Sequence, residues 1–399
     1  MEGCSLNPVF EVDVWNMPCP DAPYATLRLP ATNYELLNAL ERINVSNIED
    51  ATVTISEYME FEQELAGMKQ PLHLGQLNAL AERLSQLSLL ESTIFEGLCR
   101  MEAAKGQGGM ELCRAIDLAY STECCHVAPS ALNDSQLGRF YAENGFLPEL
   151  DKLSDEMFEL LDFEDIGIKM RKGEGGVFTT HGYVVQHTEL NQVAERMDFT
   201  VQPPDYIFRI GIVDCMRDDS GPRKVEYLEL PATEEQLNEF PGKLGLEDWM
   251  GTAMFSFDGP LPDFDRLIIS TDELPKLNDL AKRIQTLTAR GDLPKYKAVL
   301  SAESCQDLDK ALSLADALDA YYYMPSLRTV EEAGREELRF LMDHDAAELA
   351  MQHMNLATYG KAVMERHHAV LTDYGTVERR DGQPIQRQEP EPPKFQMSM

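Results

Sequence analysis

The feature that most constrains this chain is an internal repeat with a period near 200 residues. Leu29-Pro30-Ala31-Thr32 returns as Leu230-Pro231-Ala232-Thr233, and the segment Leu77–Leu84 returns as Leu277–Ile284. Further matches in the same order pair residues 115–119 with 311–315, Pro129-Ser130 with Pro325-Ser326, and Gly167 and Gly182 with Gly360 and Gly375. Because the matches are collinear and their offset shrinks slowly from 201 to 193, they indicate a diverged tandem duplication.

The repeat predicts two modules in one chain. We place the first module at residues 8–185, the second at 205–378, a linker at 186–204 and a disordered tail at 379–399. The linker is polar and ends in Pro203-Pro204, a pair that stops a helix and stiffens the connection. The tail mixes Pro, Gln and Glu and lacks the apolar residues that a core needs.

Within the first module the hydrophobic pattern predicts three small pieces, at about residues 8–65, 66–105 and 106–185. They are a sheet with one helix, a helical piece and an α+β piece. Alternating and helical spacings predict strands over Val9–Trp15, Tyr24–Leu29, Ala51–Tyr58 and Val177–Val185, and helices over Tyr34–Ile43, Leu72–Ala103, Leu112–Ala119, Ser135–Asn144 and Asp155–Met170. The second module repeats this order, with strands over Tyr206–Val213 and Lys224–Leu230 and helices over Leu274–Thr288 and Leu308–Ala320. We therefore predict an α+β fold of two similar, elongated modules.

Charge limits what such a chain can bind. Asp and Glu number 69 against 35 Lys and Arg, which gives a net charge of -34 and a pI near 4.5. A surface of this kind repels phosphate backbones and anionic lipids, so we expect no direct binding of nucleic acid or membrane and infer a basic protein partner. No stretch has the apolar length of a membrane span or the pattern of a secretory signal, so we expect a cytoplasmic protein.

Motifs for catalysis or cofactor binding are weak. The segments Gly106–Gly109 and Gly173–Gly176 lack the spacing of phosphate-binding loops and are typical of turns before strands. The best metal candidate is Cys124-Cys125-His126 with Cys113 upstream, but adjacent cysteines rarely face one ion and the spacing fits no zinc module. We therefore predict that the protein is not an enzyme and uses no cofactor or metal.

Acidic residues occur throughout both modules and are dense in the last piece of each. On one continuous helix Asp155, Glu159 and Asp162 would share a face. Such a run is ordinarily a solvated helix face, but here the excess extends through every predicted piece, which solubility does not require. We predict a collective partner-binding surface made of Glu143, Glu149, Asp151, Asp155, Glu156, Glu159, Asp162, Glu164 and Asp165 in the first module and Glu331, Glu332, Glu336, Glu337, Asp343, Asp345 and Glu348 in the second.

These motifs together resemble the ArdA-type antirestriction proteins. The resemblance lies in Leu-Pro-Ala-Thr before a helix, the L-x-x-L-N-x-L-A-x-R-L helix, the Ala-Ile-Asp-Leu-Ala helix leading to a Pro-Ser turn, and the closing segment from Gly167 to Gly182. It covers nearly all of residues 8–185 and 205–378, so the chain looks like a tandem of two such modules. Members of the family are single modules of about this size, and they usually dimerise.

The resemblance implies a DNA mimic. Its carboxylates would stand where the phosphates of bent B-form DNA lie, and it would occupy the DNA-binding groove of type I restriction-modification enzymes. The expected partners are the DNA-binding subunits of such an enzyme or another basic DNA-binding defence protein. Charge alone is compatible with this, because a net -34 equals that of roughly 17 base pairs of duplex at one charge per about 1.7 Å. We expect a monomer whose halves form a pseudo-dimer, with a homodimer as the alternative. A different function also fits the charge: an acidic adaptor or scaffold for a basic protein of a mobile element, without DNA mimicry.

Overall fold

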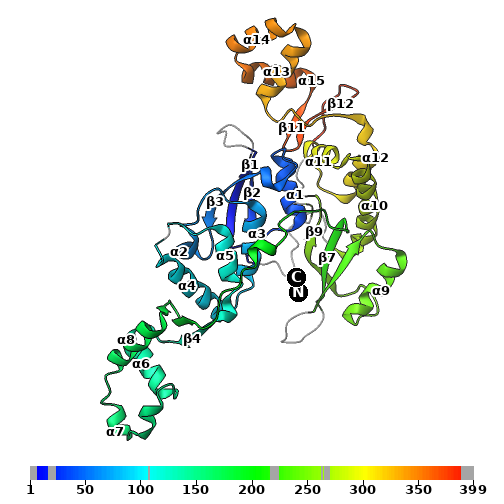
Figure 1. Ribbon diagram of the computed structural model, residues 1–399. Coiled ribbons are helices and arrows are strands. Elements are labelled where there is room, and N and C mark those ends of the chain that lie inside the picture. Colours follow the sequence, from blue (N-terminus) through cyan, green and yellow to red (C-terminus); the bar gives the residue numbers. More distant parts are fainter. Residues whose placement is uncertain are drawn as a thin grey trace, which may run out of the picture.

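The computed structural model describes residues 7–16, 24–106, 108–215, 224–261, 264 and 270–387. Helices and four small antiparallel sheets alternate along the chain, which confirms the predicted α+β class. The molecule is elongated, with helices α6–α8 at one end, α13–α15 at the other and the rest of both halves between them (Figure 1).

The first half contains two three-stranded sheets of order β2-β1-β3 and β4-β6-β5. Its helices and strands are β1 (Phe10–Trp15), β2 (Tyr24–Leu29), α1 (Asn33–Arg42), β3 (Thr52–Tyr58), α2 (Glu62–Leu65), α3 (Leu74–Ser85), α4 (Leu89–Ala103), α5 (Leu112–Ala119), β4 (Cys125–Pro129), α6 (Asp134–Glu143), α7 (Asp155–Phe158), α8 (Phe163–Glu174), β5 (Val177–Phe178) and β6 (Gly182–Gln186).

The second half repeats this order, apart from a counterpart of α2, with sheets of order β8-β7-β9 and β10-β12-β11. Its helices and strands are β7 (Phe208–Asp214), β8 (Val225–Leu230), α9 (Glu234–Leu244), β9 (Thr252–Asp258), α10 (Leu274–Arg290), α11 (Leu293–Ala302), α12 (Leu308–Asp316), β10 (Tyr321–Met324), α13 (Val330–Leu341), α14 (His344–His353), α15 (Leu356–His367), β11 (Val370–Thr372) and β12 (Gly375–Arg379).

The repeated motifs contact each other in the same way in both halves. The Asn78 side chain bonds to both the backbone N–H and the carbonyl of Ala31, at 2.7 and 3.1 Å. Asn278 does the same with Ala232, at 2.7 and 2.9 Å. The threonine that follows in each motif forms a capping box at the start of α1 or α9, which satisfies backbone N–H groups there. The Leu-Pro-Ala-Thr motif is thus fixed by the asparagine of the second repeated motif.

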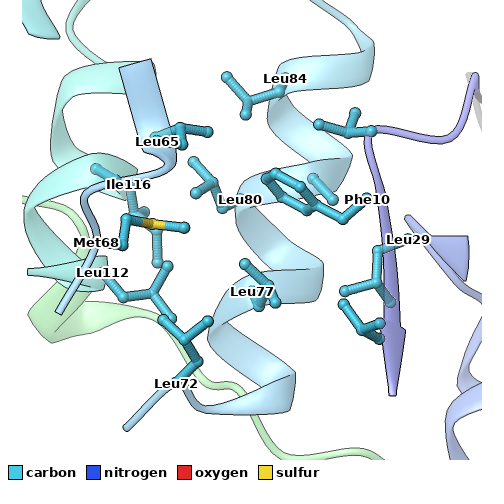
Figure 2. Packing of buried hydrophobic residues seen from close by; sticks show 14 of the residues in the cluster. Phe10, Leu29, Leu65, Met68, Leu72, Leu77, Leu80, Leu84, Leu112 and Ile116 are labelled. Atoms are coloured by element: carbon cyan, nitrogen blue, oxygen red, sulfur yellow. The ribbon is translucent and has the colours of Figure 1, made fainter. Parts of the chain in front are cut away.

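One continuous core fills most of the first half. Helix α3 packs between the β1–β3 sheet and helix α5. Figure 2 shows Phe10 and Leu29 of the sheet on one side of α3 and Leu112 and Ile116 of α5 on the other. The predicted division near residues 65 and 105 is not accompanied by a break in this core, because α5 is part of it. A separate small cluster lies beyond it, made of Ala128, Ala131, Leu137, Tyr141 and Tyr183.

Several predicted elements are interrupted. The segment Leu72–Ala103 is helical as predicted, but it consists of two helices: α3 ends at Ser85, and Ser88 begins α4 with a capping box to Glu91. The predicted strand over Val177–Val185 is the β5–β6 hairpin. The helix over Leu308–Ala320 ends at Asp316 and a 3₁₀ turn follows. In each case a local cap or turn ends the helix or strand, although the apolar spacing of the sequence continues beyond it.

The segment 186–204, predicted as a linker, packs on the first half. The N–H groups of Val193 and Ala194 both donate to Asp117 Oδ1, at 2.8 and 3.0 Å, and Ala194 belongs to the first core. Phe199 follows α3 so closely that a Cβ on Gly75 would lie 2.4 Å from the Phe199 carbonyl oxygen. The segment is therefore a structured arm along α3 and α5, not a free tether.

The prediction of a disordered tail is wrong for residues 379–387. Strand β12 reaches Arg379, the Arg380 N–H donates to the Ala320 carbonyl at 2.9 Å, and Ile385 packs on the second core. Residues 388–399 lie outside the described part of the chain.

The halves contact each other through α1 and its cap. Lys297 Nζ lies 2.5 Å from Glu41 Oε2, and Arg42 forms an ion pair with Asp373 at 2.8 Å. The Tyr374 hydroxyl donates to Asn38 Oδ1 at 2.6 Å. Within the described residues, every hydrogen bond or ion pair that joins the halves uses residues 32–42 of the first half. The contact is therefore not reciprocal.

Candidate acidic partner surface

Two helical projections carry all the predicted surface residues. We call residues 134–174 the first arm (α6–α8) and residues 330–367 the second arm (α13–α15), and they lie at opposite ends of the molecule (Figure 1). By sequence the first arm has eleven acidic and five basic side chains, and the second has eight and four. The structure therefore brings each predicted set together on its own arm and keeps the two sets far apart.

Glycines let the first and last helices of each arm cross closely. A Cβ on Gly167 would lie 1.8 Å from the carbonyl oxygen of Asp134, and one on Gly138 would lie 1.9 Å from that of Phe163. In the second arm, a Cβ on Gly360 would lie 1.7 Å from the carbonyl oxygen of Val330. Only glycine allows such backbone contact, so the repeated Gly167 and Gly360 are explained by helix packing.

Some first-arm carboxylates serve the local structure. Arg139 forms ion pairs with Glu143 at 2.7 Å and Glu159 at 2.6 Å, and these hydrogen bonds raise the pKa of the guanidinium. Asp162 accepts the Asp165 N–H as the N-cap of α8, and Asp165 pairs with Lys169 at 2.5 Å. Because the paired carboxylates are partly neutralised by Arg139 and Lys169, they add less negative charge to the surface of the arm than their number suggests.

The single helix predicted over Asp155–Met170 is wrong, and so is the shared face of Asp155, Glu159 and Asp162. Helix α7 ends at Phe158, and Asp162 caps the separate helix α8. Ser154 and Asp162 each accept a backbone N–H and so start two short helices in place of one long helix. The three carboxylates are exposed, but they lie on different elements.

Several second-arm carboxylates are also hydrogen-bonded or ion-paired to other residues of the protein. Glu332 is half-buried and accepts the N–H groups of Arg328 and Thr329, at 2.7 and 2.9 Å. Glu337 pairs with Arg366, Glu336 is 3.8 Å from Arg339, and Asp343 caps α14. Glu332 in particular is a structural group that is poorly placed to meet a partner.

The remaining predicted residues make no ion pair within the described part of the chain. They are Glu149, Asp155, Glu156 and Glu164 in the first arm and Glu331, Asp345 and Glu348 in the second. Glu331 and Glu348 are half-buried, and the other five are exposed and can meet a partner. Asp151 lies on the first arm in the 3₁₀ turn Pro148–Lys152, and its side chain is outside the described set.

Exposed carboxylates outside the predicted set lie on the central body. They follow short acidic clusters in the sequence, at the end of β3 and just after it, and in the first turn and the flank of α9. They are Glu57, Glu60 and Glu62 in the first half and Glu234, Glu235, Glu239, Glu247 and Asp248 in the second.

The structure gives no support to the cysteine cluster as a metal site. Cys124 and Cys125 are buried, and the Cys124 thiol donates to the Glu189 carbonyl at 3.2 Å. Burial raises the pKa of the Cys125 thiol to about 12, so it stays protonated and is a poor ligand at neutral pH. Among the described residues, no group of three or more His, Cys, Asp or Glu side chains gathers as a metal site would require.

A cavity of about 310 Å³ lies between the halves. Arg42, Lys297 and Asp373 are in its wall, but each is already paired, Arg42 with Asp373 and Lys297 with Glu41. The charged groups therefore serve the contact between the halves.

Comparison with known protein families finds no matching model, and comparison with curated protein sequences finds no match. Across the helices of the described residues, none has both the length and the apolar character needed to cross a bilayer.

Proposed function

We propose that this protein is an acidic DNA mimic that occupies the DNA-binding groove of a type I restriction-modification enzyme and inhibits restriction and modification. The observation that carries the proposal is the presence of exposed, unpaired carboxylates on two arms at opposite ends of an elongated body with a net charge of -34. A basic groove that binds DNA through phosphate contacts has the matching charge.

The proposal includes a tandem of two ArdA-like modules. It is supported by the repeated element order, by the Asn78–Ala31 and Asn278–Ala232 contacts, and by the glycine crossings in both arms. In this proposal the protein acts without catalysis or cofactor, in the cytoplasm, and as a monomer whose halves take the place of a dimer's two subunits.

The mechanism is competition for one electrostatic site. A basic groove gains affinity for DNA largely by neutralising phosphates and releasing their counterions. Fixed carboxylates on the arms and body offer the groove the same charge without bases or sugars. Inhibition is therefore independent of the DNA sequence that the enzyme recognises.

Direct binding of the protein to the enzyme is expected to weaken with salt. Inhibition is measured by titrating the protein into a type I enzyme with its DNA, and the dissociation constant of the protein for the DNA-free enzyme, measured at about 0.05 and 0.2 M salt, should rise at least about tenfold, because surface charges are screened over about 10 Å at 0.1 M. Absence of inhibition at stoichiometric amounts contradicts the antirestriction function. A dissociation constant for the DNA-free enzyme that does not change with salt contradicts charge mimicry. Binding to the enzyme without displacement of DNA supports the adaptor alternative.

Neutralising the unpaired first-arm carboxylates should weaken inhibition progressively. Glu156→Gln alone is expected to change affinity by well under tenfold, because one exposed charge among many contributes little. Adding Glu149→Gln, Asp155→Asn and Glu164→Gln should weaken it at each step, by more than about tenfold in total.

The matched control is Glu332→Gln. It removes one charge at a half-buried cap, so it should lower the stability of α13 more than it changes affinity. Complete loss of inhibition by Glu156→Gln in a folded protein would instead indicate a localised site.

A further inference from the structure

Each arm exposes large apolar side chains beside its carboxylates. In the second arm, Phe340, Leu341 and Met342 are consecutive at the end of α13, and Phe340 and Leu341 are 85 % and 56 % exposed. Leu349 and Met354 on and after α14 are also exposed. We call these five residues the second apolar cap.

The first arm carries an equivalent feature. Its exposed apolar residues are Phe146, Met157 and Leu160, and Leu160 is 85 % exposed. Phe146 and Met342 are separated by the offset of 196 that also relates the two Pro-Ser turns. We call these three residues the first apolar cap. Isolated exposed leucines are ordinary, but several large exposed apolar side chains on each arm of a highly charged molecule indicate interaction surfaces at both ends.

Charge decides what can cover these caps. Glu336, Asp343 and Asp345 are exposed next to the second cap, and Asp155, Glu156 and Glu159 surround Met157 in the chain. A second copy of this chain would bring one acidic arm against another, and duplex DNA offers phosphates in place of apolar groups. A surface with an apolar centre and a Lys- and Arg-rich rim complements both features.

We propose that the apolar caps are anchors that insert into apolar patches beside the basic groove of the partner enzyme. This inference rests on the proposed function and adds a contact that DNA itself does not make. The carboxylates supply the salt-dependent part of the affinity, and the caps supply a part that salt does not screen. The mimic thereby outcompetes a ligand that binds through charge alone.

The test compares two kinds of variant against one purified type I modification enzyme at about 0.05 and 0.2 M salt. The double variant Phe340→Ser with Leu341→Ser should bind the enzyme about 30-fold more weakly, which is the loss typical of interface anchor residues. The factor should be the same at both salt concentrations. The four-carboxylate variant of the first arm should lose more at low salt than at high salt. Because Phe340 and Leu341 are exposed, their replacement should leave the melting temperature unchanged.

The matched control is Leu89→Ser with Leu90→Ser, since these leucines are also well exposed but lie on α4 in the central body. Its affinity should equal that of the wild type. If the wild type inhibits and the cap variant inhibits equally, the anchors are overturned and the proposed function stands. If the wild type fails to inhibit, both are overturned. A wild-type mass that doubles with concentration, and returns to 45.0 kDa in the cap variant, would show that the caps pair copies of this chain and would overturn the anchor role.

Discussion

Gly167→Ala is expected to destabilise the first arm by about 3 kcal/mol, the upper range for forced overpacking. The new Cβ would lie 1.8 Å from the carbonyl oxygen of Asp134, which is backbone and cannot rotate away. Helices α6 and α8 must then separate, which opens the small cluster around Leu137 and Tyr141. Because this cluster is distinct from the main core, the loss should appear as local opening. Amide exchange in α6 and α8 should accelerate more than about hundredfold, while exchange in α3 stays unchanged.

Helix α8 contains its own control. Gly173 lies in the same helix, and no neighbouring atom comes within 4 Å of the place that an added methyl group would take. Gly173→Ala should therefore be neutral or stabilising by up to about 1 kcal/mol. Gly360→Ala should reproduce the Gly167 effect in the second arm. Equal exchange rates for Gly167→Ala and Gly173→Ala would contradict the close crossing.

The sequence predicted what depends on local periodicity. The alternation of Val9–Trp15 and the spacing of Leu112–Ala119 predicted β1 and α5 within a residue, because one face of each element packs on a core. The matched glycines 167 and 360 pointed to a shared constraint, although their role in helix crossing became visible only in three dimensions. Breaks at Ser88 and Asp162 were missed because one side-chain cap overrides a continuing apolar stripe.

Features that depend on distant contacts could not be predicted. Polar composition and Pro203-Pro204 predicted a stiffened linker at 186–204, but apolar residues of this segment pack on the first core along α3 and α5. The exposed carboxylates of the arms were found from the acidic run alone. Which of them are paired depends on partners such as Arg139 and Arg366, and for Glu159 and Glu337 these partners lie 20 and 29 residues away. The hydrogen bonds and ion pairs between the halves join residues 169 to 336 positions apart, so no local sequence pattern predicts them.

The contact between the halves is the site of the second large expected effect, a loss of stability. Glu41→Gln should lower the free energy of unfolding by about 3 kcal/mol, because breaking one partner of a buried ion pair leaves an uncompensated charge. The Lys297 side chain is only 3 % exposed, and Glu41 is the carboxylate within 2.5 Å of its ammonium group. The variant should also separate the halves more readily, which urea unfolding and small-angle scattering would measure.

The pH dependence of this loss has a definite sign. Burial lowers the pKa of Lys297 in the folded protein, and Glu41 opposes that shift. Removing Glu41 lowers the folded pKa of Lys297 further while the unfolded value is unchanged, so the cost is complete below the folded lysine pKa of the variant, where the ammonium group is buried without its partner. The loss of stability should shrink as pH rises toward the ordinary lysine pKa, because the neutral amine of Lys297 is then favoured in both the folded and the unfolded chain.

The double variant Glu41→Gln with Lys297→Met separates charge from packing. Methionine fills a similar volume without a charge, and replacing a whole buried pair by apolar or neutral groups is often close to neutral. Most of the lost stability should therefore return, and the pH dependence should disappear. If Glu41→Gln unfolds at the wild-type urea concentration, the ion pair does not join the halves. If the double variant is no more stable than Glu41→Gln, the loss comes from packing around Glu41 and the unpaired lysine is not its cause.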